Sequence, residues 1–191
     1  GVDIHLIEHT ADPLLDLLRR DELDCAFASV DPDKLGDEFA ATKLFEEELV
    51  ATVSLEHRLA QADHVTLQDL SGETLIAYRD GSELRRRFEW TMASEGLQPR
   101  NAFYCTEMAA VRALASSGLG VAVMPRSIAE LEGPPVAVKP VRPAPPTWPV
   151  SLVWRGRRRQ PPAAKAFLQL ALEAARGEPV APAEPARLRA A

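Results

Sequence analysis

Three predicted helix starts carry the side chains that are best placed to bind a ligand. Thr10, Ser82 and Thr106 each come just before an amphipathic run, so each brings a hydroxyl to a point where unpaired backbone N–H groups begin. Helix starts of this kind bind carboxylates or phosphates through oriented N–H groups and the helix dipole. For any single one of them, the favoured interpretation is that the hydroxyl only caps its own helix. Periodicity alone leaves open whether the three meet in one cleft.

Residue spacing gives little support to catalysis or metal binding. His5 and His9 lie on an expected strand, where four residues span about 13 Å, whereas an i, i+4 zinc pair requires a helix. Ser116 lies before Gly118 rather than inside a nucleophile elbow, and no spaced acid and histidine complete a triad. Gly118 and Gly120 follow a predicted helix rather than a strand, which argues against a dinucleotide-binding fingerprint. We expect no catalytic residue, no metal and no cofactor.

The composition indicates a folded, acidic chain with room for one large domain or two small lobes. The 191 residues are 46% apolar and carry a net charge of −6, which disfavours nucleic-acid binding by bulk electrostatics. No apolar run reaches the ~18 residues of a membrane span, and residues 1–8 lack the features of a signal peptide, which favours the cytoplasm. Cys25 and Cys105 show no metal spacing, and we interpret them as buried, reduced thiols.

Three runs of like charge are interpreted as solvated surface. The arginines at 85–87 lie on a predicted helix, where three consecutive residues fan through about 200° and cannot form one basic face. The arginines at 157–159 lie in a loop before the last helix. The glutamates at 46–48 lie on a strand, where successive side chains diverge, so a solvated strand edge is favoured over a metal site.

The order of predicted elements indicates an α/β fold. A strand at 2–7, a helix that starts near Thr10 and an apolar strand at 23–30 form a predicted βαβ unit with a parallel pair. Because the chain begins inside this first strand, we interpret it as a fragment of something longer. Between residues 39 and 105 we expect one or two strands over 39–53, a short helix capped by Thr66, a strand at 74–78, a helix at 83–95 and a strand at 102–105. A helix capped by Thr106, a strand at 121–124, a capping box at 127–130 and an edge strand at 136–141 should follow. The rest should be a rigid connector at 143–149, a strand at 150–154, a helix at 161–176 and a disordered tail at 177–191.

Six segments, in their order along the chain, resemble the effector domain of LysR-type transcriptional regulators. They are 3–27, 44–50, 57–60, 67–70, 118–125 and 150–154, and the likeness covers residues 1–176. The resemblance implies an α/β fold of the type 2 periplasmic-binding-protein class, with a first lobe from 1–53 and 148–176 and a second lobe from 54–147. Two crossover strands, near 52–55 and 145–150, would join the lobes, and a small molecule would bind in the cleft between them. The family's N-terminal helix-turn-helix, and its first effector-domain strand and helix, have no counterpart in these residues.

The same resemblance implies ligand-binding residues and a regulatory role. Ser29 stands where several members carry an arginine for an acidic effector, so a dicarboxylate ligand is a less secure expectation. The implied ligand-binding residues are Thr10, Ser29, Asp80, Gly81, Ser82, Cys105, Thr106 and Glu107. We expect a sensor of a small polar or anionic metabolite that forms a homodimer or higher homo-oligomer, has no membrane partner, and contacts promoter DNA only through a domain outside this chain. Two alternatives are a solute-binding protein of a transport system with the same fold, and an enzyme on this fold that uses Cys105 and Glu107.

Overall fold

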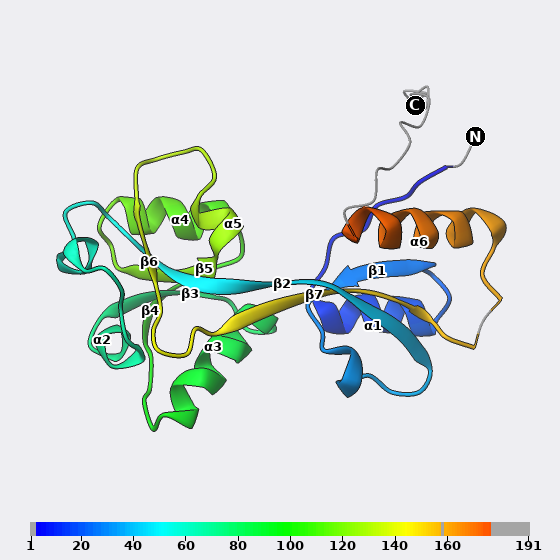
Figure 1. Cartoon of the computed structure of the whole chain (residues 1–191), viewed down its shortest axis with the longest axis horizontal. Coiled ribbons are helices and arrows are strands. Elements are labelled where there is room, and N and C mark those ends of the chain that lie inside the picture. Colours follow the sequence, from blue (N-terminus) through cyan, green and yellow to red (C-terminus); the bar gives the residue numbers. More distant parts are fainter. Residues whose placement is uncertain (1–2, 158, 177–191) are drawn as a thin grey trace. The chain divides into compact units, whose positions relative to one another are not determined.

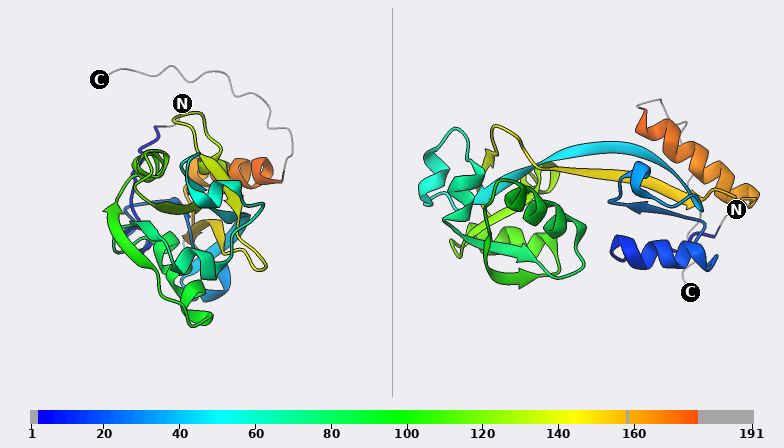
Figure 2. Two further views of the ribbon diagram at one scale, coloured as in Figure 1. Left: turned by 90° about the vertical axis from the view of Figure 1, so that its left-hand side faces the viewer. Right: turned by 90° about the horizontal axis from the view of Figure 1, so that it is seen from below.

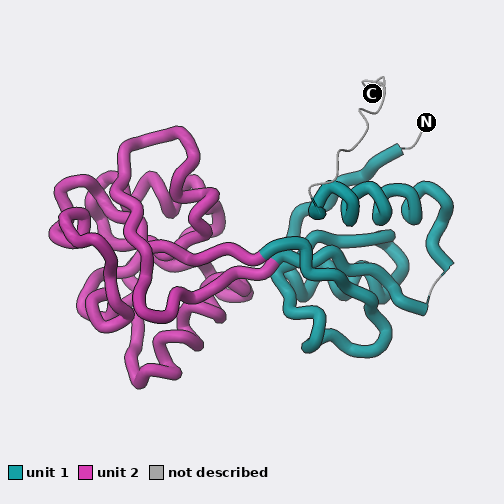
Figure 3. Tube along the Cα trace, in the orientation of Figure 1, with its two compact units in different colours: residues 1–45, 150–191 teal, residues 46–149 magenta. Residues whose placement is uncertain are grey.

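The computed structural model describes residues 3–157 and 159–176 and divides the chain into two compact units (Figures 1 and 3). The first unit takes residues up to Phe45 and those from Val150 onwards, and the second is Glu46–Pro149. The chain passes between the units within strand β2 (Phe39–Val53) and again within strand β7 (Thr147–Arg155). The lobe boundaries expected near residues 53 and 148 stay predictions. The predicted tail at 177–191 lies outside the described residues.

The first unit packs two helices on opposite faces of a small antiparallel sheet (Figures 1 and 2). Strand β1 (Cys25–Ala28) pairs antiparallel with β7. Helix α1 (Ala11–Arg19) buries its leucine stripe against one face, in a core of Ala11, Leu14, Leu15, Leu18, Ala26, Ala28, Phe39 and Val153. On the other face Phe27 meets Phe167 of helix α6 (Pro162–Ala175) edge to face, with 6.3 Å between the ring centroids. A short 3₁₀ turn (Pro32–Lys34) lies between β1 and β2.

The predicted βαβ unit with a parallel strand pair is wrong. Residues 3–10 form no strand, and Ile4 and Leu6 are 75% and 93% exposed. The alternating pattern marks a segment that could be a strand, but a strand also needs a neighbour to satisfy its backbone groups. Among the described residues no strand pairs with this segment, and β1 is paired with the antiparallel β7 instead.

The second unit is a mixed sheet in which β2 runs antiparallel to both of its neighbours in this unit, while the other strands share one direction. Its strands lie in the order β2-β5-β3-β4, and β6 (Ala137–Pro140) pairs with β2 on the other side. Strand β3 (Thr74–Tyr78) runs parallel to both β4 (Arg100–Cys105) and β5 (Val121–Pro125). The helical segments are the 3₁₀ turn Arg58–Gln61, α2 (Leu67–Ser71), α3 (Glu83–Ser94), α4 (Met108–Ser116) and α5 (Arg126–Ala129).

Helices α3 and α4 cover opposite faces of this sheet (Figure 1). The chain leaves β3 outward to β4 and then returns past β3 to β5, and right-handed crossovers in opposite directions place their helices on opposite faces. Helix α3 buries Leu84, Phe88 and Met92, and α4 buries Val111 and Ala115. Strand β5 is buried along its whole length between them.

Several predictions made from local sequence signals are confirmed. Strand β3 spans the predicted residues, and Thr66 and Asp69 form a reciprocal capping box at α2. Gly96, at φ +70°, follows the end of α3. Residues 39–53 form a single strand, and β7 begins at Thr147, so the predicted connector at 143–149 is shorter than expected. Predicted helix 161–176 is confirmed as α6.

Two predicted helix caps are wrong. Helix α4 begins at Met108 with Glu107 as its N-cap residue, so Thr106 lies one position before the cap. Helix α5 begins at Arg126, and no side chain caps it locally. The backbone N–H of Ser127 donates instead to the Glu47 carboxylate at 3.2 Å, 80 residues away in sequence. A tertiary contact with Glu47 therefore satisfies a backbone N–H at the start of α5, in place of the local capping box predicted at 127–130.

The acidic run at 46–48 is engaged in hydrogen bonds and ion pairs, contrary to the prediction of a merely solvated edge. Thr147 donates its hydroxyl to Glu46 at 2.6 Å, and Glu48 pairs with Arg126 at 3.2 Å and with Arg142 at 3.5 Å. With Glu47 on Ser127, all three carboxylates bind groups of the second unit. These contacts hold residues 46–48 of β2 against neighbouring segments of the second unit.

Candidate functional site

The loop after β3 presents three of the predicted ligand-binding residues. Ser82 is the N-cap residue of α3, and its hydroxyl accepts the Arg85 N–H at a long 3.5 Å. Gly81 has φ +85°, a left-handed conformation that glycine adopts without steric cost. The Asp80 side chain is 95% exposed. The loop thus offers a carboxylate and a hydroxyl at the start of a twelve-residue helix.

The loop after β4 presents three more predicted residues beside the first loop. Tyr78 and Cys105 are register partners in the parallel pair, and the Arg79 N–H donates to the Cys105 carbonyl at 3.0 Å. Since the two strands run parallel and end together, loops 80–82 and 105–107 leave the same edge of the sheet. Thr106 and Glu107 are exposed there, and Cys105 is half-buried. The structure therefore brings these two sets of predicted residues together.

The first unit holds the two remaining predicted residues, Thr10 and Ser29. Thr10 is the N-cap residue of α1 but makes no side-chain capping bond. Ser29 follows β1, and its buried hydroxyl has no hydrogen-bond partner among the described residues. An unpaired buried hydroxyl costs about 1–3 kcal/mol, and such orphans occur where a ligand or water supplies the partner. The roles of Thr10 and Ser29 in ligand binding stay predictions.

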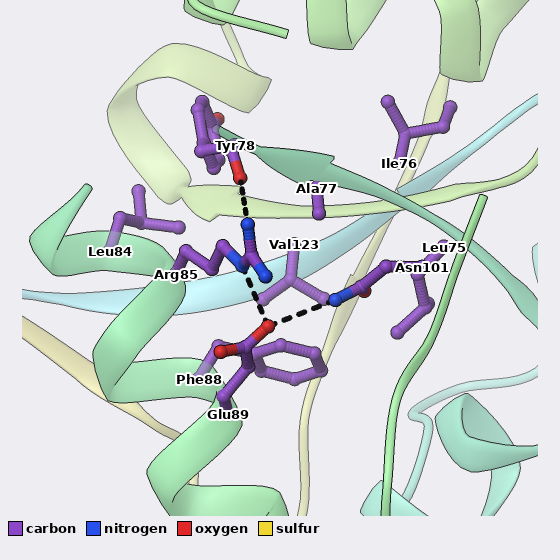
Figure 4. Close-up of a pocket in the computed structure, with 10 residues that line it drawn as sticks. All are labelled: Leu75, Ile76, Ala77, Tyr78, Leu84, Arg85, Phe88, Glu89, Asn101 and Val123. Carbon is purple, nitrogen blue, oxygen red and sulfur yellow. Dashed lines mark hydrogen bonds and ion pairs between the residues drawn. The ribbon is translucent and has the colours of Figure 1, made fainter. Parts of the chain in front are cut away.

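A small, mostly apolar hollow, partly open to solvent, lies between α3 and the sheet (Figure 4). It is lined by Leu75, Ile76, Ala77, Tyr78, Leu84, Arg85, Phe88, Glu89, Asn101 and Val123. The predicted ligand-binding residues are not part of this lining. The hollow belongs to the packing of α3 and borders the candidate site through Tyr78 and Arg85.

Sequence reasoning missed Arg85, which we had interpreted as solvated surface. Its side chain is 20% exposed and contacts groups from α3, β3 and β4, and Figure 4 shows its contacts with Glu89 and Tyr78. Nε donates to Glu89 at 2.7 Å, Nη1 donates to Asp80 at 2.5 Å and to the Tyr78 carbonyl at 3.5 Å, and the guanidinium stacks 5.0 Å from the ring centre of Tyr104. The hydrogen bond with Glu89 raises the Arg85 pKa further above its ordinary value. The i, i+4 spacing of Arg85 and Glu89 was the sequence signal that could have revealed the pair.

The other two arginines of this run are also paired, and of the three only Arg86 is mainly solvated, as predicted. Arg86 and Arg87 both bind Glu83, at 2.6 and 3.0 Å. Their side chains are 51% and 23% exposed. Glu83 lies three residues before Arg86 and four before Arg87, so the sequence signal was the spacing of each arginine from Glu83 rather than the run of arginines itself.

Burial perturbs one titratable group in each unit, Tyr78 in the second and Cys25 in the first. Burial raises the pKa of the Tyr78 phenol, whose hydroxyl has no hydrogen-bond partner among the described residues. Burial, with the nearby charge of Asp24, also raises the pKa of the Cys25 thiol. Cys25 and Cys105 are free thiols that belong to different units, and both are half-buried rather than buried. In the part of the chain that the structure describes, no group of three or more His, Cys, Asp or Glu is arranged to hold a metal ion.

No helix among residues 3–157 and 159–176 combines the length and apolar character needed to cross a membrane.

Comparisons with known proteins identify relatives along most of the chain. The "Hydrogen peroxide-inducible genes activator" of Haemophilus influenzae is 26% identical over 156 residues, which cover 81% of this chain and 51% of that protein. The "Uncharacterized HTH-type transcriptional regulator YybE" of Bacillus subtilis is 30% identical over 113 residues, which cover 59% of this chain and 38% of that protein. The chain thus spans about half, or less, of the length of these regulators.

Solved structures of similar fold cover most of the chain. The effector-binding domain of QuiR in complex with shikimate is 26% identical, with a TM-score of 0.77 over 88% of this chain and 79% of that one. The reduced form of OxyR is 25% identical, with a TM-score of 0.73 over 91% of this chain and 79% of that one. These effector-binding domains have the type 2 periplasmic-binding-protein fold that the sequence led us to expect. A family model described as "LysR substrate binding domain" matches residues 1–176, and the chain therefore belongs to the LysR substrate-binding domain family.

Proposed function

We propose that this chain is the effector-sensing part of a LysR-type transcriptional regulator. The observation that carries the proposal is the register of Tyr78 with Cys105, which puts loops 80–82 and 105–107 at one edge of the second unit's sheet. Ligands of α/β proteins bind at the carboxyl ends of parallel strands, and these loops occupy that edge. Occupancy would shift a conformational or oligomeric equilibrium, and so change how attached DNA-binding domains are presented.

The proposed ligand is a small polar or anionic metabolite. Ser82 and Thr106 supply hydroxyls beside the starts of α3 and α4, where the helix dipole favours negative charge. In the first unit, Ser29 supplies a buried hydroxyl that has no hydrogen-bond partner among the described residues, and Thr10 supplies a hydroxyl that does not cap α1. The related QuiR domain is described in complex with shikimate, which is consistent with a small ligand. That residues of both units share one ligand stays a prediction.

The proposal includes no catalytic step and no cofactor, and it assigns DNA contact to a domain outside this chain. Because the chain is acidic, it has no bulk attraction to DNA of its own. A regulator of this type acts in the cytoplasm, where the chromosome lies. The alternative of a solute-binding protein for transport is disfavoured, since the curated relatives described above are transcriptional regulators.

We also propose that the protein forms a homodimer or higher homo-oligomer. Strand β4 ends the second unit's sheet, and Tyr104 and Phe103 on it are 56% and 37% exposed, while Trp90 on α3 is 73% exposed. Exposed aromatic side chains beside an open strand edge are typical of association surfaces. Analytical ultracentrifugation of wild type and Tyr104→Arg tests this, with a shift to monomer expected for the variant.

A thermal-shift screen tests the ligand site. We expect at least one small metabolite to raise the melting temperature of wild type, and Ser82→Ala or Thr106→Val to weaken that effect. Ser94→Ala is the matched control, because Ser94 lies at the other end of α3 and its hydroxyl bonds only the local Thr91 carbonyl at 2.8 Å. A ligand whose effect is unchanged in both site variants would contradict the proposed location.

A further inference from the structure

Arg85 lies where the candidate ligand loop meets α3, and two carboxylates of very different exposure hold its guanidinium. Glu89, 34% exposed, accepts from Nε, and the same carboxylate oxygen accepts from Asn101 of β4 at 2.9 Å. Asp80, 95% exposed, accepts from Nη1 at 2.5 Å. Glu89 thus belongs to a network between α3 and β4 (Figure 4). Asp80 instead contacts Arg85 from the exposed loop that follows β3.

The Asp80 contact is the one that can be exchanged at small cost. Asp80 is well hydrated when it separates from Arg85, because its side chain is 95% exposed, and the less exposed guanidinium keeps its hydrogen bonds to Glu89 and to the Tyr78 carbonyl. The Tyr104 ring and the Tyr78 carbonyl hold the guanidinium in place whether or not Asp80 is bound. Arg85 is therefore a preorganised cation whose outward N–H group faces the loop that carries Ser82.

A ligand carboxylate at this position would meet favourable groups. It would take the hydrogen bond from Nη1 that Asp80 now accepts, in the charge-assisted geometry that suits guanidinium and carboxylate. It would also lie near the start of α3, where the dipole favours an anion. A neutral ligand of the same shape would gain neither interaction.

We propose that Arg85 is a further ligand-binding residue of this site, that it takes a carboxylate group of the effector, and that Asp80 competes with the ligand for it. The proposal rests on the proposed function, since it needs a ligand at loop 80–82. It narrows the ligand from a polar or anionic metabolite to a carboxylic acid. It also assigns opposite effects to two residues in contact, because Arg85 attracts the ligand and Asp80 displaces it.

The test measures dissociation constants of the 191-residue chain for matched pairs of a carboxylic acid and its neutral amide, by isothermal titration calorimetry. Benzoate with benzamide and shikimate with its amide are the first pairs, followed by the best-binding acid of a broader metabolite screen. The variants are Arg85→Gln, Asp80→Asn and the combination of both. Arg86→Gln is the matched control, since Arg86 follows Arg85 on the same helix and pairs with Glu83.

The expected pattern is specific. The acid binds at least about tenfold more tightly than its amide, and Arg85→Gln removes that difference. Asp80→Asn tightens acid binding by about two- to fivefold, the range of an exposed ion pair. This tightening disappears in the Arg85→Gln background, because there is no guanidinium left to compete for. Arg86→Gln binds like wild type.

Other outcomes separate this proposal from the proposed function. Equal binding of acid and amide, binding of neutral or phosphorylated compounds alone, or a tightening by Asp80→Asn that persists without Arg85 would overturn the role of Arg85 and leave the effector site standing. Failure of every compound class to bind would overturn both. If Arg85→Gln does not fold, Arg85→Lys replaces it, and the preference for the acid over its amide should then shrink rather than vanish, because lysine keeps the charge but loses the planar fork. An unchanged preference in Arg85→Lys would, like equal binding of acid and amide by wild type, count against the role of Arg85.

Discussion

Tyr78 and Cys105 are register partners in neighbouring parallel strands, and this pairing decides where the candidate site lies. The two residues are far apart in sequence, yet their strands end at the same level of the sheet. The loops that follow them carry most of the predicted ligand-binding residues. Any interaction that holds β3 and β4 in the sheet therefore also holds the candidate site.

Gly120 permits the close approach of β5 to β3, so Gly120→Ala should destabilise the second unit. A Cβ at this position would lie 2.5 Å from the Thr74 carbonyl oxygen, which is backbone and cannot move aside alone. Overpacking of this kind costs about 1–3 kcal/mol in unfolding free energy, measured by urea denaturation. Gly72→Ala is the control, because its Cβ would make an ordinary 3.5 Å contact and its backbone is helical. Equal stability of the two variants would contradict the steric argument.

Arg112 is a buried cation that binds only backbone carbonyls through the hydrogen bonds observed for it, so Arg112→Met should loosen the segment after α5. The side chain donates to the carbonyls of Ala129, Leu131 and Pro134, at 3.2, 2.9 and 2.8 Å. Losing these charge-assisted bonds should lower the unfolding free energy by about 2–4 kcal/mol.

Hydrogen exchange locates this effect, with faster exchange expected for residues 129–135. Arg112→Lys should restore little stability, because one ammonium cannot reach three carbonyls in the geometry of the guanidinium fork. The exposed Arg100→Gln is the control and should change stability by less than about 0.5 kcal/mol. Full rescue by lysine would show that charge rather than geometry matters.

Asp69 should make stability depend on pH in the acid range. Hydrogen bonds from the Thr66 hydroxyl and backbone N–H lower the pKa of this carboxyl below its ordinary 3.8. Because the folded pKa is depressed, the contribution is fully present above about pH 4 and is lost as pH falls through the folded pKa. Asp69→Asn should therefore be less stable than wild type at pH 7 and approach it at low pH, as followed by urea denaturation between pH 2.5 and 7. The exposed Asp63→Asn should show no such convergence.

Glu48 should contribute modestly and in a salt-dependent way. Its ion pairs with Arg126 and Arg142 are roughly 40% exposed on both sides, so screening by water limits each to about 1 kcal/mol or less. A double-mutant cycle of Glu48→Gln and Arg126→Gln measures the coupling energy in low and in 0.5 M salt. We expect a coupling that shrinks with salt, and a large, salt-insensitive coupling would show that the pair is desolvated.

Local signals predicted those elements whose stabilising partners lie nearby in sequence. Leu84, Phe88 and Met92 recur at helical spacing and form the buried stripe of α3. The cap of α2 was predictable because Thr66 and Asp69 are three residues apart. The ordered motifs along residues 1–176 also predicted the family, which the comparisons confirm.

Tertiary structure decided the features whose partners are distant. The alternating residues 2–7 predict a strand, but among residues 3–157 and 159–176 no strand pairs with them. Glu47 replaces the predicted local cap of α5 from 80 residues away, and Asn101 of β4 joins Arg85 and Glu89 in one network. Sequence by itself thus determined which segments could be helices or strands and which family the chain resembles, because these depend on periodicity and local hydrogen bonds. Which side chains meet at the candidate site depended on strand register, since backbone pairing between distant segments fixes it.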